Sequence, residues 1–484
     1  MFTMVTSAMA QDIPSSSPSG TLQSTLLAVE VTAPADRYEK PASRTATRTN
    51  TPSLLTAQSI QIVPRTLIDD QAALTLDDAV RNVSGVQYDF GFNGAMQPLL
   101  ILRGFPNTSM TASGSMSGSS SYYLDGSKVM GVPIDMANVQ SVEVVKGPGS
   151  VLYGRSEPGG LVNVVTKQIS SVSERSFEQT VGQRGMARTA IAASGMLSRN
   201  EAMRGRIAAA YYTANSIRDG VVDRLGSFTG SLAWVPNLDT NITAIVDHSR
   251  NRYRTDMGIP AFGDRPARLP WSRQYNDSPY LSSANTTSVK VDVTRQLDES
   301  WQVRSRLLHL DSHTSEMDIY PYRGDFGMGT RPSETCPGSG TPMCRYYFGV
   351  RPDGRYRISH ANIDLTGKSQ TGAISHTVLI GIDTYRTGKT GATYMEQIES
   401  VDVFHPSPGD TRGLDIRSAS TDGEDYSHWR SGYVQDQIAL GQRVFVTAAL
   451  RRDRTNAVFG GASTRPNRII HDTSPRCGMA VRTR

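Results

Sequence analysis

Two short segments of the sequence resemble motifs that bind nucleotides. Thr387-Gly388-Lys389-Thr390 matches the end of a phosphate-binding loop, but the first glycine of that motif would fall on Asp383. Gly147-Pro148-Gly149 lacks the third glycine of a dinucleotide-binding turn, because position 152 is leucine. Without these glycines the backbone cannot form the cradle that a phosphate group needs. We therefore expect no nucleotide site.

One histidine pair has a spacing that binds metal ions on helices. His309 and His313 are four residues apart, but they lie in a segment whose pattern has a period of two, which indicates a strand. On a strand this spacing separates two Cα atoms by about 13 Å, too far for one metal ion. A Gly-x-Ser-x-Gly nucleophile motif is absent. Nothing here requires an enzyme, a resident metal or an intrinsic cofactor.

The composition excludes several classes of protein. Of the 484 residues 38% are hydrophobic and 20% are charged, both below the usual values for globular domains. Polar residues interrupt every apolar stretch well before the ~18 residues of a membrane helix. The formal charge is +5, but the eight arginines of residues 451–484 account for it. We therefore expect no basic surface for nucleic acid.

The N-terminus and the cysteines point to export. Ser7-Ala8-Met9-Ala10 has the small-x-small form of a cleavage site, although the first basic residue is Arg37. We interpret residues 1–10 as the remnant of a signal peptide, the alternative being a chance match. Cys336 and Cys344 bracket a loop rich in Gly, Ser, Pro and Thr, which suits a local disulfide, whereas Cys477 has no evident partner.

Residues 11–49 read as a flexible lead-in, because they are dominated by Ser, Thr and Pro. Within them, residues 26–33 form a short β-prone run. A lone strand in a flexible tether can add to the sheet edge of a partner protein. It can equally be an edge strand of the next domain, and the residues alone leave both readings open.

Residues 50–168 have the mixed pattern of a small α+β domain. A helix is predicted near residues 76–83, where Leu76, Ala79, Val80 and Val83 share one face. Compact apolar runs at residues 99–102, 142–145 and 161–165 predict buried strands. Residues 111–121 carry six serines and two glycines, which predicts a loop.

Residues 169–484 consist of segments of about ten residues in which apolar and polar residues alternate. Val289, Val291 and Val293, for example, alternate with Lys290 and Asp292. Alternation suits a soluble sandwich or an outer-membrane barrel, in which the charged face lines the lumen. Tight turns alternate with long polar loops near 255–283, 314–355 and 392–425, and this asymmetry favours the barrel. We count about 11 or 12 such segments.

The stretch from Tyr122-Tyr123-Leu124-Asp125-Gly126 through Val142-Glu143-Val144-Val145-Lys146-Gly147-Pro148-Gly149 to Pro158-Gly159-Gly160 closely resembles the plug domain of TonB-dependent siderophore receptors. The resemblance extends upstream through Leu102-Arg103-Gly104-Phe105 and downstream to Tyr433-Val434-Gln435-Asp436-Gln437. It implies an outer-membrane antiparallel β-barrel with an N-terminal α+β plug domain at residues 50–168. One departure is Ser141, where the family usually has an arginine.

The resemblance also implies a function and a set of partners. It implies TonB-dependent import of a ferric siderophore across the bacterial outer membrane, driven by TonB and its inner-membrane energising complex. The TonB box would be Ala28, Val29, Glu30, Val31, Thr32 and Ala33. Candidate ligand-contacting residues are Tyr88, Phe90, Phe92, Tyr122 and Tyr123, although burial in the plug core is at least as good a reading. Plug residues with a structural role would be Arg103, Glu143, Lys146, Gly147 and Gly154.

Two other functions remain open at this point. A TonB-dependent transporter of heme, cobalamin or a glycan belongs to the same class, and a secreted β-rich binding protein belongs to a different one. Plugged transporters have about 22 strands, so residues 169–484 would supply about half of a barrel. From the strand count we expect a receptor truncated at its C-terminus and in its signal peptide, which would neither insert stably nor import iron when expressed alone.

Overall fold

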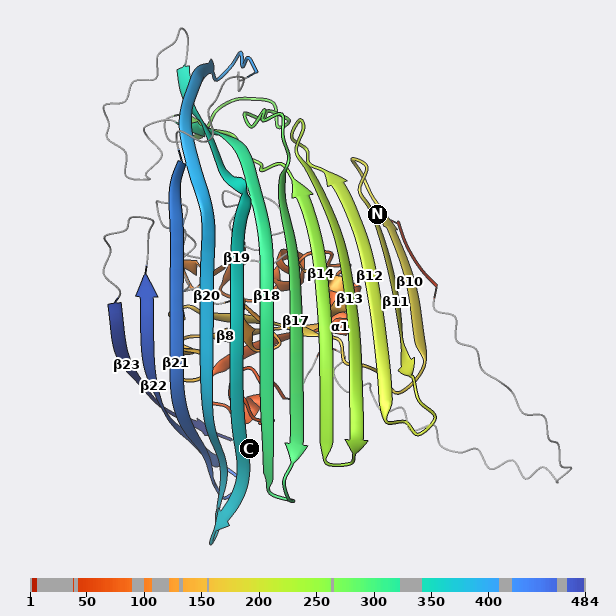
Figure 1. Cartoon of the computed structure of the whole chain (residues 1–484), viewed down its shortest axis with the longest axis vertical. Helices are drawn as coiled ribbons and strands as arrows, with labels where there is room; N and C mark the ends of the chain where they lie inside the picture. Colours follow the sequence, from red (N-terminus) through yellow and green to blue (C-terminus); the bar gives the residue numbers. More distant parts are fainter. Residues whose placement is uncertain are drawn as a thin grey trace, which may run out of the picture.

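The structure of the chain, a computed structural model, describes residues 2–6, 38, 42–88, 100–106, 122–129, 134–154, 156–262, 265–322, 342–408, 420–458 and 468–482. Two parts make up the fold: a large curved antiparallel sheet, and a smaller α+β domain held inside its curve (Figure 1). We call the smaller part, residues 42–167, the inner domain. None of the helices in the described residues is long and apolar enough to cross a membrane.

Among the described residues thirteen strands form the large sheet. Twelve of them pair in chain order, apart from a small hairpin between the sixth and seventh strands of the sheet, and the first strand of the chain adds at one edge. The strands are, in sheet order, β1 (Phe2–Thr6), β10 (Glu174–Val181), β11 (Ala187–Met196), β12 (Met203–Asn215), β13 (Val222–Asn237), β14 (Thr240–Tyr253), β17 (Ser282–Gln296), β18 (Trp301–Tyr322), β19 (Pro342–Thr371), β20 (Ile374–Asp402), β21 (Ser420–Leu440), β22 (Val444–Val458) and β23 (Arg468–Val481). Twelve of them lie in residues 169–484, which agrees with the count of 11 or 12 segments. Residues 2–6, expected to be a signal remnant, pair with β10 as an edge strand.

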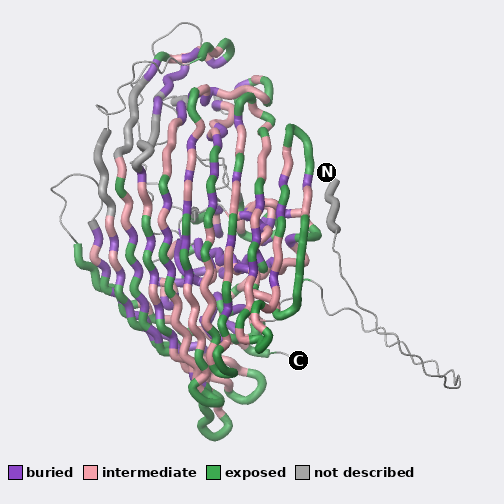
Figure 2. Tube along the Cα trace, turned by 45° about the vertical axis from the view of Figure 1, so that its right-hand side comes forward, coloured by how far each residue is buried: buried purple, intermediate pink, exposed green. Residues whose placement is uncertain are grey.

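The sheet buries its charged face and exposes its apolar face. On β17 Lys290 is buried, whereas Val289 next to it is 43% exposed. The same inversion holds on β20, where Asp383 is buried and Ile382 is 60% exposed. Figure 2 shows the buried positions gathered toward the inside of the curve. This inside-out pattern is the one that a barrel in lipid requires, and it rules against a soluble sandwich.

The connections differ at the two ends of the sheet, as the sequence predicts, but two of the long loops are shorter than expected. Tight turns join β13 to β14, β17 to β18 and β21 to β22. The segments expected to be loops at 314–355 and 392–425 are partly strand: β18 runs on to Tyr322, and β19 begins at Pro342. Cross-strand pairs between residues 316–322 and 344–350 extend the ladder there, despite the polar composition.

The inner domain contains a five-stranded mixed sheet in the order β2-β8-β9-β6-β7 and a three-stranded sheet in the order β3-β4-β5. Its elements are η1 (Ser53–Leu55), β2 (Ser59–Pro64), α1 (Arg65–Asp70), α2 (Leu76–Val80), β3 (Val86–Tyr88), β4 (Leu100–Leu102), β5 (Phe105–Pro106), β6 (Tyr122–Leu124), β7 (Ser127–Lys128), η2 (Met136–Asn138), β8 (Val139–Lys146), α3 (Ser150–Tyr153) and β9 (Gly160–Thr166). A separate hairpin, β15 (Ala261–Phe262) with β16 (Arg265–Pro266), lies between β14 and β17. The predicted strands at 99–102, 142–145 and 161–165 are confirmed.

The predicted helix at 76–83 is confirmed at its start and ends earlier than expected. Thr75 and Asp78 form a capping box, in which each side chain accepts a hydrogen bond from the backbone N–H of the other residue. Helix α2 ends at Val80, and the chain then turns through Gly85, whose φ is +71°. Val83 is nevertheless buried with the helical residues, so the predicted apolar face is correct.

The apolar core of the inner domain continues into the wall of the large sheet. Val142 and Val144 of β8 pack in one cluster with Val162 and Val164 of β9. The same cluster takes in residues of the large sheet, namely Leu308, Leu310, Ile358, Tyr385 and Trp429. The two parts therefore share one apolar core.

The flexible lead-in ends earlier than the sequence indicates. Within residues 42–49 only Ala42 and Arg44 escape burial, and the boundary expected at residue 49 is too late. The hydroxyls of Ser43 and Thr45 donate hydrogen bonds to the buried carboxylate of Glu143. Gln435 Nε2 of β21 donates to the carbonyl oxygen of Thr47 at 2.9 Å. Serine and threonine, which read as linker composition, here satisfy buried polar groups.

We predict that Gly159→Ala destabilises the inner domain by about 1–3 kcal/mol, because a Cβ atom there would lie 2.0 Å from the carbonyl oxygen of Leu102. Gly432→Ala on β21 is the matched control, since a Cβ there meets no atom within 4 Å. Amide hydrogen exchange of β8 and β9 measures the effect. Equal protection in the two variants would contradict the close approach of Gly159 and β4.

Candidate functional site

The interface between the inner domain and the large sheet is built around Arg48. This residue adopts a φ of +57° and its side chain is 5% exposed. Its guanidinium donates to the Tyr433 hydroxyl, lies 3.5 Å from an Asp364 oxygen and lies 3.7 Å from an Asp383 oxygen. It also stacks over the Tyr153 ring, 5.0 Å from the ring centre. One arginine of the inner domain thus contacts strands β19, β20 and β21.

Arg451 of β22 completes this network from the sheet side. It binds both carboxylate oxygens of Asp383, at 2.8 and 2.9 Å, and an oxygen of Asp453 at 2.8 Å. Burial lowers the pKa of Arg48, but the Tyr433 oxygen and the carboxylates of Asp364 and Asp383 outweigh burial and raise it overall. Arg48 therefore stays charged. A buried charge that loses its partner costs about 3–5 kcal/mol, so the pairs depend on one another.

A second contact uses the turn between β6 and β7. Asp125 and Gly126 both have positive φ, 50° and 79°, which is the two-residue hairpin that Asp-Gly favours. The turn directs the Asp125 carboxylate to the wall, where Lys290 Nζ of β17 donates to it at 2.8 Å. Lys290 also lies 3.1 Å from Asp247 of β14. Thr166 donates to Asp125 from its backbone N–H and its hydroxyl.

A third contact fastens the segment before β8. Arg188 of β11, 2% exposed, donates to both Asp135 oxygens at 2.6 and 3.0 Å, and to Glu178 at 2.8 Å. Asp135 in turn caps η2 by accepting from the backbone N–H of Ala137. On the far side, Ser127 Oγ lies 3.0 Å from His360 Nδ1 of β19. The inner domain is thus held by polar contacts around the curve of the sheet.

Of the residues predicted to contact a ligand, two are buried and the side chains of the other three lie outside the described residues. Tyr122 and Tyr123 are each 1% exposed, Tyr122 in the shared core and Tyr123 against the Tyr153 ring, with 4.8 Å between the ring centres. Burial raises the pKa of both. Neither is available to a ligand at the surface, which favours the alternative of burial. Tyr88 ends β3, and its side chain is outside the described residues, as are Phe90 and Phe92.

The residues predicted to have structural roles make contacts within the inner domain or with the sheet. Glu143 accepts hydrogen bonds from Ser43 and Thr45, and Lys146 Nζ donates to Ser84 at 2.6 Å. Gly147, with φ +94°, donates to the Gly159 carbonyl. A Cβ on Gly154 would lie 3.1 Å from Arg451 Nη2. Arg103 is exposed, with φ +51° in a turn, and its backbone N–H donates to Gly85.

The remaining sequence-based predictions fall partly outside the described residues. The strand at residues 26–33, including the predicted TonB box, lies outside them. Cys344 is disulfide-bonded and Cys477 is free and exposed; the expected partner Cys336 is not among the described residues, so that pairing stays a prediction. Thr387 and Lys389 lie on β20, and His309 and His313 lie on β18. No group of three His, Cys, Asp or Glu in the described part of the chain could hold a metal.

Sequence reasoning missed the centre of this interface. Arg48 lies in a segment that reads as linker, and Asp364, Asp383 and Arg451 are lumen-face residues on three different strands. A charge on the inward face of each strand was visible in the alternation, but which charges meet depends on the register of distant strands. The one available signal was that the inward charges of a barrel need counter-charges from whatever fills it.

Two family models match the chain. The model described as "TonB-dependent Receptor Plug Domain" matches residues 53–161, and the model described as "TonB dependent receptor-like, beta-barrel" matches residues 227–481. The first match falls on the inner domain and the second on strands β13 to β23. Together they cover both sides of the interface described above.

Curated relatives and solved structures agree with these matches. The chain is 25% identical over 368 residues to the ferrioxamine receptor of Yersinia enterocolitica, covering 73% of this chain and 48% of the relative. It is 26% identical over 363 residues to the ferrichrome outer membrane transporter/phage receptor of Escherichia coli K12, covering 71% and 47%. The chain thus spans about half the length of the curated relatives it matches.

Among solved structures, the closed form of the ferric-catecholate import receptor of E. coli K12 superposes with a TM-score of 0.76 at 19% identity, covering 92% of this chain and 65% of that one. The ferripyoverdine receptor of Pseudomonas aeruginosa gives 0.75 at 21% identity, covering 91% and 57%. At these identities the likeness establishes the fold.

We predict that Lys290→Met loosens the inner domain by about 1.5–3 kcal/mol, because it leaves Asp125 and Asp247 without their shared cation. Lys368→Met, which removes the same charge from an exposed position on β19, is the control. Amide hydrogen exchange of residues 122–129 should rise in Lys290→Met alone. Unchanged exchange there would show that Lys290 does not anchor the β6–β7 turn.

The same pair gives a pH dependence that serves as a second readout of this variant. Burial raises the pKa of Asp125, but Lys290 and the hydrogen bonds from Lys290 and Thr166 outweigh burial, so that the pKa is lowered from 3.8. A lowered folded-state pKa stabilises the fold above about pH 4, and the gain is lost as the pH falls further. Protection of residues 122–129 should therefore fall between about pH 5 and about pH 3, and it should fall less in Lys290→Met.

Proposed function

The chain belongs to the TonB-dependent receptor family, and we propose that it is the substrate-binding and transport part of an outer-membrane receptor that imports a ferric siderophore. The observation that carries the proposal is the inner domain held against the charged face of an inside-out sheet by buried ion pairs. This supports the interpretation of the inner domain as a removable obstruction inside a membrane wall. An active importer needs such an obstruction, whereas a passive pore does not need one.

The choice of substrate rests on the relatives. Their names specify ferrioxamine and ferrichrome, and the names of the structural neighbours specify ferric catecholate and ferripyoverdine. These are chemically different chelates that share the iron. A ferric siderophore is therefore the substrate class that we infer for this chain, without a choice among hydroxamate, catecholate and mixed chelates.

The partners follow from the same proposal. TonB, with its inner-membrane energising complex, would pair with the strand at residues 26–33 by β-augmentation. The exposed apolar residues of the sheet, such as Phe228 at 48% and Trp234 at 48% exposure, would face outer-membrane lipid. The end of the sheet with short turns would then face the periplasm, and the end with long connections would face the outside.

We expect the gene product in which this chain occurs to restore growth of an iron-starved host that has TonB but lacks its own siderophore receptors. The panel is ferrioxamine, ferrichrome, a ferric catecholate and ferripyoverdine, with heme and cobalamin as the alternative substrates. At least one chelate should restore growth, and deletion of TonB should abolish the effect. Rescue by heme or cobalamin alone would reject the siderophore assignment and keep the transporter class.

We predict that Val29→Pro abolishes uptake while leaving ferric-siderophore binding at the cell surface intact. Proline fixes φ and removes a ladder hydrogen-bond donor, so the segment could no longer add to the edge of a partner sheet. Val29→Thr keeps the extended geometry and is the control, which should retain uptake. Normal uptake by Val29→Pro would move the partner-binding strand elsewhere in the chain.

A further inference from the structure

A cavity of about 450 Å³ lies between the inner domain and strands β14, β17 and β18. Its charged lining comes from both sides of the interface. Arg44 and Arg48 enter from residues 42–49, Lys290 from β17, and Arg304 and Arg306 from the start of β18. The cavity lies toward the end of the sheet with short turns, because Arg304 follows the β17–β18 turn by a few residues.

Positive charge exceeds negative charge around this cavity. Five cationic side chains line it, and the carboxylates that line it are Asp125, Glu143 and Asp292. Two of these carboxylates are already engaged, because Lys290 binds Asp125 and the hydroxyls of Ser43 and Thr45 bind Glu143. Arg48 is compensated outside the cavity by Asp364 and Asp383. Asp292 is the lining carboxylate that Arg304 and Arg306 bind, and Asp364, outside the lining, also acts on Arg44 and Arg306.

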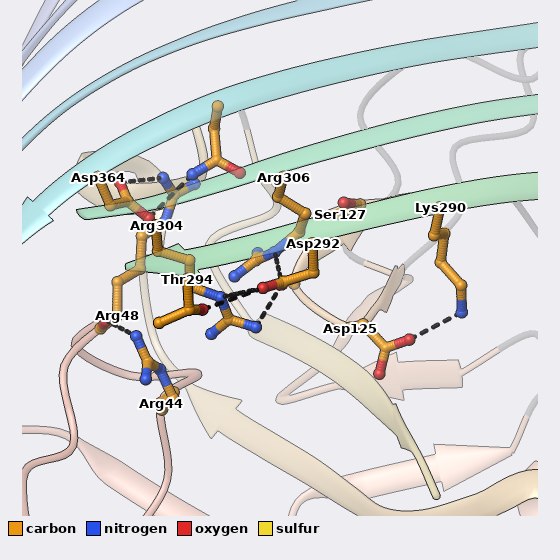
Figure 3. A network of polar contacts seen from close by, with 12 residues as sticks. Arg44, Arg48, Asp125, Ser127, Lys290, Asp292, Thr294, Arg304, Arg306 and Asp364 are labelled. Carbon is orange, nitrogen blue, oxygen red and sulfur yellow. Dashed lines mark hydrogen bonds and ion pairs between the residues drawn. The ribbon is translucent and has the colours of Figure 1, made fainter. Parts of the chain in front are cut away.

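Asp292 is occupied mainly by Arg304. The Arg304 guanidinium donates to both Asp292 oxygens, from Nε at 2.9 and 3.0 Å and from Nη2 at 2.5 Å. Arg306 reaches the same carboxylate from Nε at 3.4 Å, its single hydrogen bond among the described residues. Figure 3 shows the Arg306 head group turned toward the space beside Asp292. Its two terminal nitrogens are therefore free to bind something else.

Arg44 has less compensation than Arg306. Its hydrogen bond within the described residues goes from Nη2 to the carbonyl oxygen of Arg48, at 3.4 Å. Desolvation, together with the nearby positive charges of Arg304 and Arg306, lowers the pKa of Arg44 to about 10. The guanidinium remains protonated at neutral pH, but it is held among like charges. An anion between Arg44 and Arg306 would relieve that repulsion.

We propose that this cavity binds a small oxyanion, a carboxylate or a phosphate, between the guanidinium groups of Arg44 and Arg306. A planar guanidinium matches the paired oxygens of either group, and charge-assisted hydrogen bonds of this kind are the strong ones in proteins. Asn241 also lines the cavity and supplies a neutral donor through its side-chain amide nitrogen, while its Oδ1 accepts a hydrogen bond from the Thr243 hydroxyl at 3.3 Å. Binding of a free anion is independent of the transport activity proposed above, whereas binding of a chelate-borne carboxylate rests on that proposal.

The oxyanion has two possible sources, which are a free anion in the periplasm and a carboxylate carried by a ferric chelate. We test both by isothermal titration of the purified full chain in detergent at low salt, where screening is weak. The probes are inorganic phosphate, citrate and ferric citrate. Binding of phosphate or citrate alone indicates a free anion, and binding of ferric citrate without binding of citrate indicates the chelate.

The variants are Arg44→Gln and Arg306→Gln, with Arg295→Gln as the control. Arg295 lies on β17 close to the same end of the sheet, but it is exposed and outside the cavity lining. Loss of one charge-assisted contact should weaken binding of the bound probe by ~10-fold or more in each of the first two variants. Arg295→Gln should bind as the unaltered chain does. Equal affinity in all four proteins would overturn the proposal.

A second measurement covers the case in which a variant does not fold. Arg44 forms no ion pair with a described carboxylate, so Arg44→Gln breaks none, whereas Arg306→Gln removes a contact to Asp292. In the unaltered chain, phenylglyoxal modification of Arg44 is followed by mass spectrometry with and without citrate or phosphate. Slower modification of Arg44, with no change at Arg295, supports the site. Equal modification rates with every probe overturn it.

Discussion

The charged face of the sheet has to be buried, and this constraint organises the rest of the structure. Asp364, Asp383 and Asp453 project inward from three strands, and without cations between them they would repel one another in a poorly hydrated space. Arg451 supplies one cation from the sheet itself, and Arg48 supplies the other from the inner domain. The sheet therefore reaches a balanced interior only with residues 42–49 in place.

The contact between the inner domain and the large sheet combines apolar packing with ion pairs, and these two interactions differ in the free energy needed to separate them. Leu308, Leu310 and Ile358 of the sheet share the apolar core of the inner domain, and separating them exposes apolar area to water. The ion pairs behave differently. Once the contact opens, water solvates the separated charges, and this solvation offsets much of the electrostatic energy that is lost when the pairs break. Ion pairs therefore suit the movement that the proposed import would require of the inner domain.

The sequence predicts the architecture well and the interface poorly, for a physical reason. Alternation, turn spacing and the capping residues of α2 are local, so strand number and helix position can be read from them. The Thr-rich segment at 42–49 reads as linker because several partners of its polar groups are far away in the chain. The Thr45 hydroxyl donates to Glu143, the Thr49 hydroxyl accepts from Gln437, and the Thr47 carbonyl oxygen accepts from Gln435. The pairing of Arg48 with Asp364 depends on the register of strands hundreds of residues later. The extension of β18 to Tyr322 was hidden for a similar reason, since a polar strand is recognised by its pairing partner.

The position of Arg48 in the chain bears on the order in which the contacts of the interface would break under tension. Residues 42–49 follow the segment proposed to pair with TonB, with residues 34–41 between them. Tension applied at residues 26–33 would therefore reach Ser43 and Thr45, which bind Glu143 of β8, before it reaches Arg48. Arg48 is held through several contacts on three strands, whereas β2 and β8 behind it are held by a ladder of backbone hydrogen bonds and a shared core. Withdrawal of Arg48 would leave Asp364 without its cation while Arg451 keeps Asp383 paired. Withdrawal of residues 42–49 would therefore cost Asp364 its cation and Glu143 the hydroxyl donors Ser43 and Thr45, and none of the backbone pairing between strands of the large sheet.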